Sequence, residues 1–145
     1  MLERHLGTGR VGRGFVRGFG LRQGAFGATL AHDAHNLVVV GVDDAAMARV
    51  VARLAELGGG IVVADADGIR SELPLPVAGL LSDRPLAEVL DASRALNAAA
   101  AELGVEYQHP FQALAFLALS VIPSLKITDR GLVDVDRFEL VDLRA

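Results

Sequence analysis

The segment AHDAHN, residues 31–36, places two histidines, an aspartate and an asparagine within five positions. Imidazole and carboxylate groups transfer protons near neutral pH, contact ligands and coordinate metals. One interpretation is a turn held by hydrogen bonds of Asp33 and Asn36. A second is proton transfer or ligand contact by His32, Asp33 and His35. Metal ligation is the third, although one HxxH pair with one aspartate is a poor metal cage by itself.

The local conformation decides whether these side chains can act together. In an extended segment His32 and His35 point to opposite faces, because side chains alternate along a strand. A sharp turn at Asp33-Ala34 would bring them together. The segment directly precedes an apolar run, 37–40, so we expect it to lie at the edge of a sheet.

Other polar motifs favour structural roles. GTGRVG (7–12) matches the dinucleotide fingerprint, but no buried strand precedes it and no helix can follow it, so we expect a turn. The arginine-glycine alternation that continues to residue 22 is typical of solvated strands, and its arginines could contact an acidic partner domain. His109 and the aspartates at 65, 67, 129, 134 and 136 are interpreted as turn or surface residues.

Periodicity predicts the elements that position the segment. Apolar residues at helical spacing follow Asp43-Asp44 until three glycines, 58–60, stop the helix. A second helix starts near Pro85 and ends at Gly104, and a third is predicted over 111–122. Strands are expected at 14–21, 37–40, 61–64 and 69–73 and on either side of a turn at 129–131, with 37–40 buried on both faces and a hairpin turn at 65–68.

The order of these elements predicts an α+β fold, with a mixed or mostly antiparallel sheet covered by two to three helices. The length of 145 residues suits a single compact domain, 1–145. The formal net charge of -4 gives no electrostatic case for binding nucleic acid or an anionic membrane. The absence of cysteine fits a reducing cytoplasm, and no apolar run reaches the length of a membrane span.

Several blocks of the sequence, read together, carry a family resemblance. They are ERH near the N-terminus, AHD.HN followed by VVG, ELGGGIVV, ELPLP.AGL.SD.P and PF..L.FL.L.VIP.LK.TD.GLVDV, where dots mark positions not counted. In this order and spacing they resemble the C-terminal domain of bacterial-type adenine deaminases. The resemblance runs from Glu3 to about Phe138.

The resemblance implies an accessory role. Adenine deaminases belong to the amidohydrolase superfamily and hydrolyse adenine to hypoxanthine and ammonia, with manganese or iron held by histidines and carboxylates of a (β/α) barrel. The chain has no HxH pair, so it is expected to hold no metal or other cofactor itself and to support or cover the barrel, in cis or in trans. His32, Asp33, His35 and Asn36 match the family's most recognisable block, whereas Ala34 replaces its usual serine.

The same resemblance places Arg4 and His5, together with Asn36, as candidates for contact with the barrel or the substrate. The alternative function is a free-standing, non-catalytic module that binds a purine or a protein. Apolar surface left exposed where a barrel should dock would favour homo-oligomers.

Overall fold

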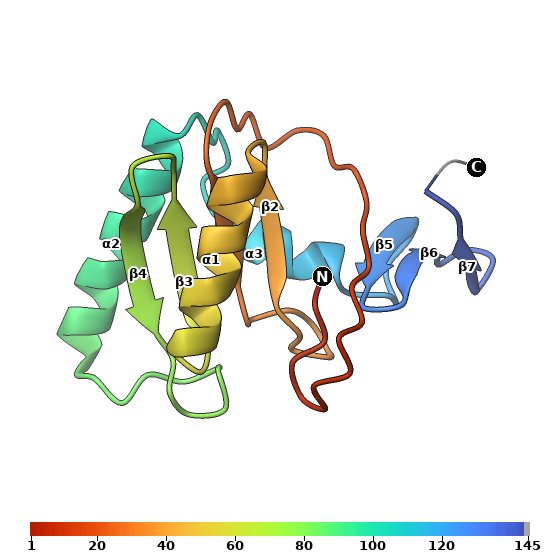
Figure 1. The fold of residues 1–145 in the computed structure, drawn as a ribbon, viewed down its shortest axis with the longest axis horizontal. Helices are drawn as coiled ribbons and strands as arrows, with labels where there is room; N and C mark the ends of the chain where they lie inside the picture. Colours follow the sequence, from red (N-terminus) through yellow and green to blue (C-terminus); the bar gives the residue numbers. More distant parts are fainter. Residues whose placement is uncertain (144–145) are drawn as a thin grey trace.

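The computed structural model describes residues 1–143 and has the predicted α+β architecture (Figure 1). A four-stranded antiparallel sheet has the order β2-β1-β3-β4, and a separate three-stranded sheet has the order β5-β6-β7. In chain order the elements are β1 (Ala25–Ala28), β2 (Val38–Gly41), α1 (Asp44–Glu56), β3 (Gly60–Ala64), β4 (Ile69–Pro74), α2 (Leu86–Glu102), α3 (Pro110–Leu117), β5 (Leu125–Thr128), β6 (Gly131–Asp134) and β7 (Glu139–Val141).

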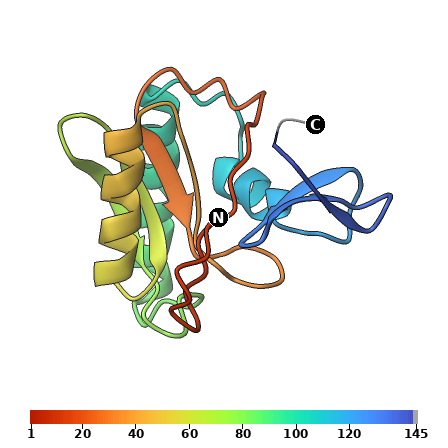
Figure 2. The same ribbon diagram turned by 45° about the vertical axis from the view of Figure 1, so that its right-hand side comes forward.

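Helices cover both faces of the larger sheet (Figure 2). Helix α1 packs on one face against β1, β2 and β3, while α2 contacts β3 and β4 and α3 contacts β1 and β2. Two apolar clusters result, one on each side of the sheet. The central strands β1 and β3 are buried along their whole length, which is why both consist of small and β-branched residues with a single aromatic ring, Phe26.

Helix α1 forms where its pattern predicts it. The Asp43 carboxylate accepts a hydrogen bond of 2.7 Å from the backbone N–H of Ala46 and so caps the helix N-terminus. Val50 and Leu54 are buried against the sheet. A Cβ atom on Gly27 would lie 2.8 Å from a methyl group of Val50, so β1 needs glycine here for the helix to pack closely.

Strand β2 differs from its prediction. The run 37–40 was expected to be buried on both faces, but β2 is an edge strand in which Val38 is buried and Val39 and Val40 are only partly buried. A β-branched run fits an edge strand packed on a helix as well as a central strand, so composition alone did not distinguish them.

The strand predicted at 14–21 is absent, and the prediction was wrong. These residues run without regular secondary structure, and the strand forms later, at Ala25–Ala28. Gly18 and Gly20 have φ values of 102° and 77°, which a β-strand does not contain. We call residues 13–18 the N-terminal arm. GTGRVG forms a loop, as expected, and a backbone bond of 3.0 Å from Glu3 to Arg10 closes it.

The region after α2 differs from its prediction in two respects. Helix α3 ends at Leu117 and turns continue to residue 124, instead of a helix to residue 122. Pro123 disfavours helical dihedral angles at Ile122 alone, so it gives no reason for the helix to end as early as Leu117. The strands beside the turn 129–131 are confirmed, but they join β7 in a second sheet instead of extending the first. Among residues 1–143, no helix has the length and apolar composition needed to cross a membrane.

Candidate functional site

The segment 31–36 forms a tight turn between β1 and β2. The backbone N–H of His35 donates a hydrogen bond of 2.6 Å to the carbonyl of Ala31, and His35 has a φ of 49°. The ring centroids of His32 and His35 consequently lie 5.9 Å apart, with an interplanar angle of 67°. The two imidazoles therefore gather on one side of a turn, as the sharp-turn alternative requires. We refer to residues 31–36 as the histidine turn.

Arg4 anchors the histidine turn from the N-terminal segment. Its Nε donates a hydrogen bond of 2.6 Å to the carbonyl of His35, and its Nη2 donates one of 2.6 Å to the carbonyl of Ala78. Its backbone N–H donates to Oδ1 of Asn36 at 3.3 Å. Burial lowers the pKa of Arg4, but an arginine remains charged throughout the physiological range. The guanidinium thus joins three separate segments of the chain.

Gly79 leaves the space that Arg4 occupies. It has a φ of 74°, and a Cβ atom at this position would lie 2.7 Å from Nη2 of Arg4. A side chain at Gly79 would therefore displace the guanidinium from its carbonyl partners. The segment Ala78-Gly79 therefore belongs to the site, and apart from the glycine itself no sequence pattern predicted this.

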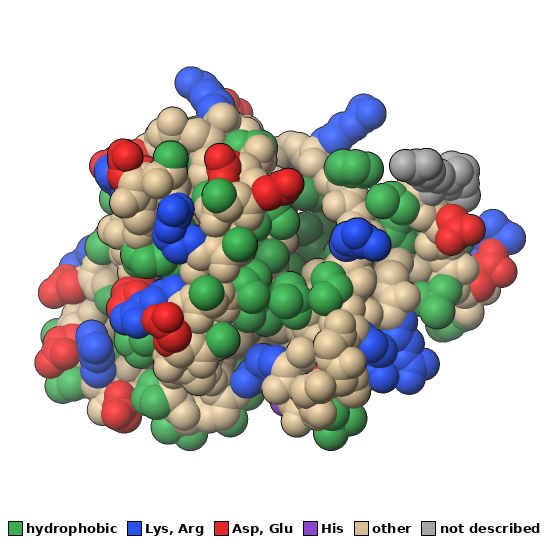
Figure 3. All heavy atoms as spheres, in the orientation of Figure 1, with side chains coloured by type: hydrophobic (Ala, Val, Ile, Leu, Met, Phe, Trp, Pro, Cys, Tyr) green, Lys and Arg blue, Asp and Glu red, His purple; other side chains and the backbone are tan. Residues whose placement is uncertain are grey.

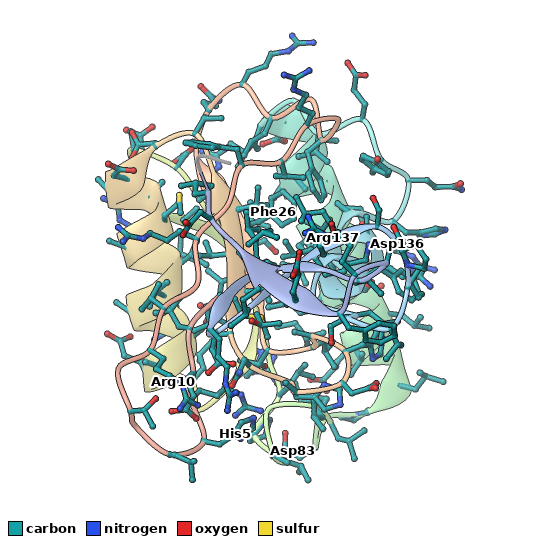
Figure 4. All side chains as sticks on the ribbon, turned by 90° about the vertical axis from the view of Figure 1, so that its right-hand side faces the viewer. His5, Arg10, Phe26, Asp83, Asp136 and Arg137 are labelled. Atoms are coloured by element: carbon teal, nitrogen blue, oxygen red, sulfur yellow. The ribbon has the colours of Figure 1, made fainter. Side chains whose placement is uncertain are left out.

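His5 contacts the carbonyl next to the one that Arg4 binds, at the end of the molecule that also carries Arg10 (Figure 4). Its Nε2 lies 2.8 Å from the carbonyl oxygen of Ala34. Glu3 shapes this loop, because its carboxylate accepts hydrogen bonds from the backbone N–H groups of Thr8, Leu6 and His5. These bonds, with that of Thr8 contributing most, lower the pKa of Glu3 from 4.5 to about 2.

Asn36 and Asp33 have contrasting environments. Asn36 is buried, and its side-chain oxygen accepts the bond from Arg4, which gives it a structural position at the start of β2. Asp33 is exposed, and its carboxylate accepts no hydrogen bond from residues 1–143. Neither side chain closes the turn, as that interpretation required: the backbone bond from His35 to Ala31 closes it, and Asn36 joins it to the N-terminal segment.

Phe116 is a neighbour that sequence reasoning missed. Its ring centroid lies 5.7 Å from that of His32, with a tilt of 41°, and 40% of its surface is exposed. It was counted only as part of a buried third helix. The early end of α3 places it at the surface beside the histidine turn, and α-helical periodicity could not show where that helix would end.

The burial of one ring nitrogen of His35 bears on the tautomer of its imidazole. Nδ1 of His35 is buried and has no hydrogen-bond partner within the described chain. A tautomer with its proton on Nε2 leaves only a lone pair at this buried position, which costs less than an unpaired N–H. The outer nitrogen is then the donor. The turn therefore presents one imidazole donor, a second imidazole at His32 and one carboxylate, which suits ligand contact or proton transfer.

The other polar residues that were interpreted as turn or surface residues occupy such positions. Asp65 accepts hydrogen bonds from the backbone N–H groups of Asp67 and Gly68 at 2.9 and 3.2 Å, which confirms the hairpin turn. Asp129 pairs with Arg10 at 2.6 Å. His109 is exposed at the start of α3.

Comparison with known proteins gives consistent matches along the chain. Residues 1–139 match the protein family described as the adenine deaminase C-terminal domain. The chain is 52% identical over 145 residues to an adenine deaminase of Archaeoglobus fulgidus, which covers 100% of this chain and 26% of the relative. It is 58% identical over 141 residues to one of Cereibacter sphaeroides, covering 97% and 25%. The chain therefore spans about a quarter of the length of these relatives.

Proposed function

The chain belongs to the family of adenine deaminase C-terminal domains, and on this premise we propose that it is the accessory part of an enzyme that hydrolyses adenine to hypoxanthine and ammonia. The chemistry belongs to the remaining part of that enzyme, an amidohydrolase-type barrel that holds manganese or iron. The lack of cysteine agrees with the reducing cytoplasm, where we place the enzyme.

The residues of this chain do not fit the metal. Among residues 1–143, no group of three or more His, Cys, Asp or Glu side chains is placed so that it could hold a metal ion. The histidine turn offers two imidazoles and one carboxylate on an exposed loop, and its inner imidazole nitrogen is buried. We therefore assign the metal to the barrel. No step of the reaction is assigned to a metal ion bound by this chain.

The observation that carries the proposal is the anchoring of the histidine turn by Arg4. One charge-assisted hydrogen bond of 2.6 Å joins Arg4 to the carbonyl of His35 in the turn and a second of 2.6 Å joins it to Ala78, and such preorganisation is what a contact surface at an active site requires. Phe116, near the end of α3, contacts His32, and the turns that follow α3 carry further exposed apolar side chains at Val121 and Ile122, of which Val121 is 70% exposed. We propose that this surface docks against the barrel and places the histidine turn over its active site.

The test is a chimera in which this chain replaces the matching quarter of the Cereibacter sphaeroides adenine deaminase. We expect the chimera to deaminate adenine and the substitution His32→Ala to lower kcat/KM by about tenfold or more, as loss of a ligand contact or proton donor does. His109→Ala, an exposed histidine far along the chain from the turn, is the matched control and should leave kcat/KM unchanged.

Two results would contradict the proposal. One is an enzyme that keeps full stability and full activity when the matching quarter is deleted. The other is a His32→Ala chimera with the same kcat/KM as the unsubstituted chimera, which would remove the histidine turn from the active site while leaving the family assignment intact.

A further inference from the structure

The outer edge of β2 presents backbone groups that no other part of the described chain pairs. Leu37 exchanges two backbone hydrogen bonds with Leu2, of 2.8 and 3.1 Å, on the side away from β1. Backbone N–H and C=O groups alternate in direction along a strand. Those of Val38 and Val40 therefore point toward β1, whereas those of Val39 and Gly41 point away from it. The bond from the N–H of Val42 to the carbonyl of Gly24 confirms this alternation.

The N–H and C=O groups of Val39 and Gly41 therefore form an open strand edge. No hydrogen bond within residues 1–143 reaches these four groups. The opposite edge of the sheet, β4, carries the charged residues Arg70 and Glu72 and ends in Pro74, which are the usual protections against pairing with another strand. The sequence of β2, VVVG, contains none of them.

A groove runs along this open edge. Its volume is about 580 Å³, and the hydrophobic side chains that surround it gather in the middle of the face shown in Figure 3. One wall is β2 and the other is the N-terminal arm, with α3, β5 and β6 completing the lining. No backbone hydrogen bond joins residues 13–18 to any other described residue, so both walls offer unpaired backbone groups.

All charged side chains that line the groove are positive. Arg17 and Lys126 are the only charged side chains in its lining, and the lining contains no acidic residue. Lys126 donates hydrogen bonds to the carbonyls of Pro123 and Leu125, and neither cation forms an ion pair with a carboxylate of residues 1–143. An occupant that complements the groove is therefore apolar where it meets the walls and acidic where it meets these cations.

We propose that the groove binds an extended polypeptide segment that alternates apolar and acidic side chains and adds a strand to the edge of β2. Backbone pairing with Val39 and Gly41 would supply affinity, the apolar walls would take every second side chain, and Arg17 would select acidic residues. This function is separate from the proposed function above, because no residue of the histidine turn lines the groove.

The test is an NMR titration of the ¹⁵N-labelled chain with a capped seven-residue peptide that alternates valine and glutamate. We expect the largest shift changes at the amides of Val39 and Gly41 and in the N-terminal arm, with a Kd below about 1 mM. A peptide with lysine in place of glutamate should bind about tenfold more weakly, and Arg17→Glu should abolish this preference, because the new carboxylate then offsets the charge of Lys126. Arg13→Glu changes a neighbouring arginine outside the lining and should preserve the preference.

Three outcomes would overturn the proposal. They are an absence of shift changes at Val39 and Gly41 with the acidic peptide, an unchanged preference in Arg17→Glu, and shifts at these amides that depend on the concentration of the chain alone. The last outcome would assign the edge to a second copy of the chain. None of them bears on the chimera experiment, so failure here leaves the proposed function standing.

Discussion

Single residues near the N-terminus hold the histidine turn in place. Glu3 organises the loop that carries Arg4 and His5, and Arg4 then bonds to the backbone of the turn. The side chains with the strongest chemical signal in the sequence, His32 and His35, therefore depend on residues about thirty positions earlier in the chain. The effect of changing these supporting residues follows from their contacts.

The carboxylate of Glu3 should give the loop a specific acid sensitivity. Its pKa is about 2 in the folded chain and near 4.5 when unfolded, so the folded state binds this proton more weakly. The stabilisation is complete above about pH 4.5 and is lost as the pH falls towards 2. NMR titration of the Glu3 carboxyl group should show the low pKa, and Glu3→Gln should flatten the dependence of unfolding free energy on pH in this range. A Glu3 that titrates near 4.5 would contradict the hydrogen-bonded loop.

Gly79 should be required for the position of Arg4. Gly79→Ala imposes a strained φ of 74°, at a cost of about 1 kcal/mol, and displaces the guanidinium, at a further cost of about 1 kcal/mol. Gly58→Ala is a close control, because Gly58 has a φ of 71° and open space around its Cβ position. Urea unfolding should show a larger loss of unfolding free energy for Gly79→Ala than for Gly58→Ala. Equal losses would show that displacement of Arg4 does not contribute.

Residue types predicted the histidine turn, but not its surroundings. The cluster of polar residues before an apolar run marked positions 32–36, and the turn did bring the two imidazoles together. The contacts with Ala78 and Phe116 could not be predicted, because they join segments distant in the sequence through a backbone carbonyl and through an early helix end. Neither feature leaves a periodic pattern.

At the scale of elements, local signals predicted α1, β3 and the hairpin to β4, since each combines a continuous apolar pattern with a clear stop. The errors occur where tertiary contacts decide the conformation. Glycine-rich residues 14–21 have the alternation of a strand, but left-handed glycines keep them irregular. Strands β5 and β6 were predicted but β7 was not, and the separation of the three into a second sheet involves a contact with the N-terminal segment, the ion pair of Arg10 and Asp129.

The contact between Gly12 and the turn of the second sheet should hold that sheet in position. A Cβ atom on Gly12 would lie 1.8 Å from the carbonyl oxygen of Thr128, so Gly12→Ala must move one of the two segments. We expect faster hydrogen exchange in β5 and β6 with little change in β1 and β3. Gly14→Ala is the control and should have a smaller effect, because its Cβ would meet the side chains of Leu132 and Ile127 in the same sheet but no backbone atom. Unchanged exchange in both variants would show that the second sheet is held elsewhere.

At the scale of the whole molecule, the fold leaves two surfaces that its own elements do not cover. One is the apolar surface beside the histidine turn, where Phe116 contacts His32 and the exposed Val121 and Ile122 follow in the turns after α3, and the other is the open edge of β2. The first surface is the one expected from the proposed function, since the chain spans about a quarter of its relatives' length, whereas the second belongs to the separate inference on the groove. The acidic net charge of -4 limits association but does not remove these surfaces.

The apolar surface beside the histidine turn should make the separate chain associate with itself. Val121 is 70% exposed and Phe116 is 40% exposed, and burial of such side chains favours association by about 25 cal/mol per Å². Sedimentation velocity at increasing concentration should show oligomers of the 145-residue chain, and Val121→Ser should shift them towards monomer. Phe138→Ser, which changes an 87% exposed residue between β6 and β7, is the control and should leave the distribution unchanged. If only Phe138→Ser dissociated the oligomers, the chain would associate through its second sheet. The surface beside the histidine turn would then not be the region that requires a partner.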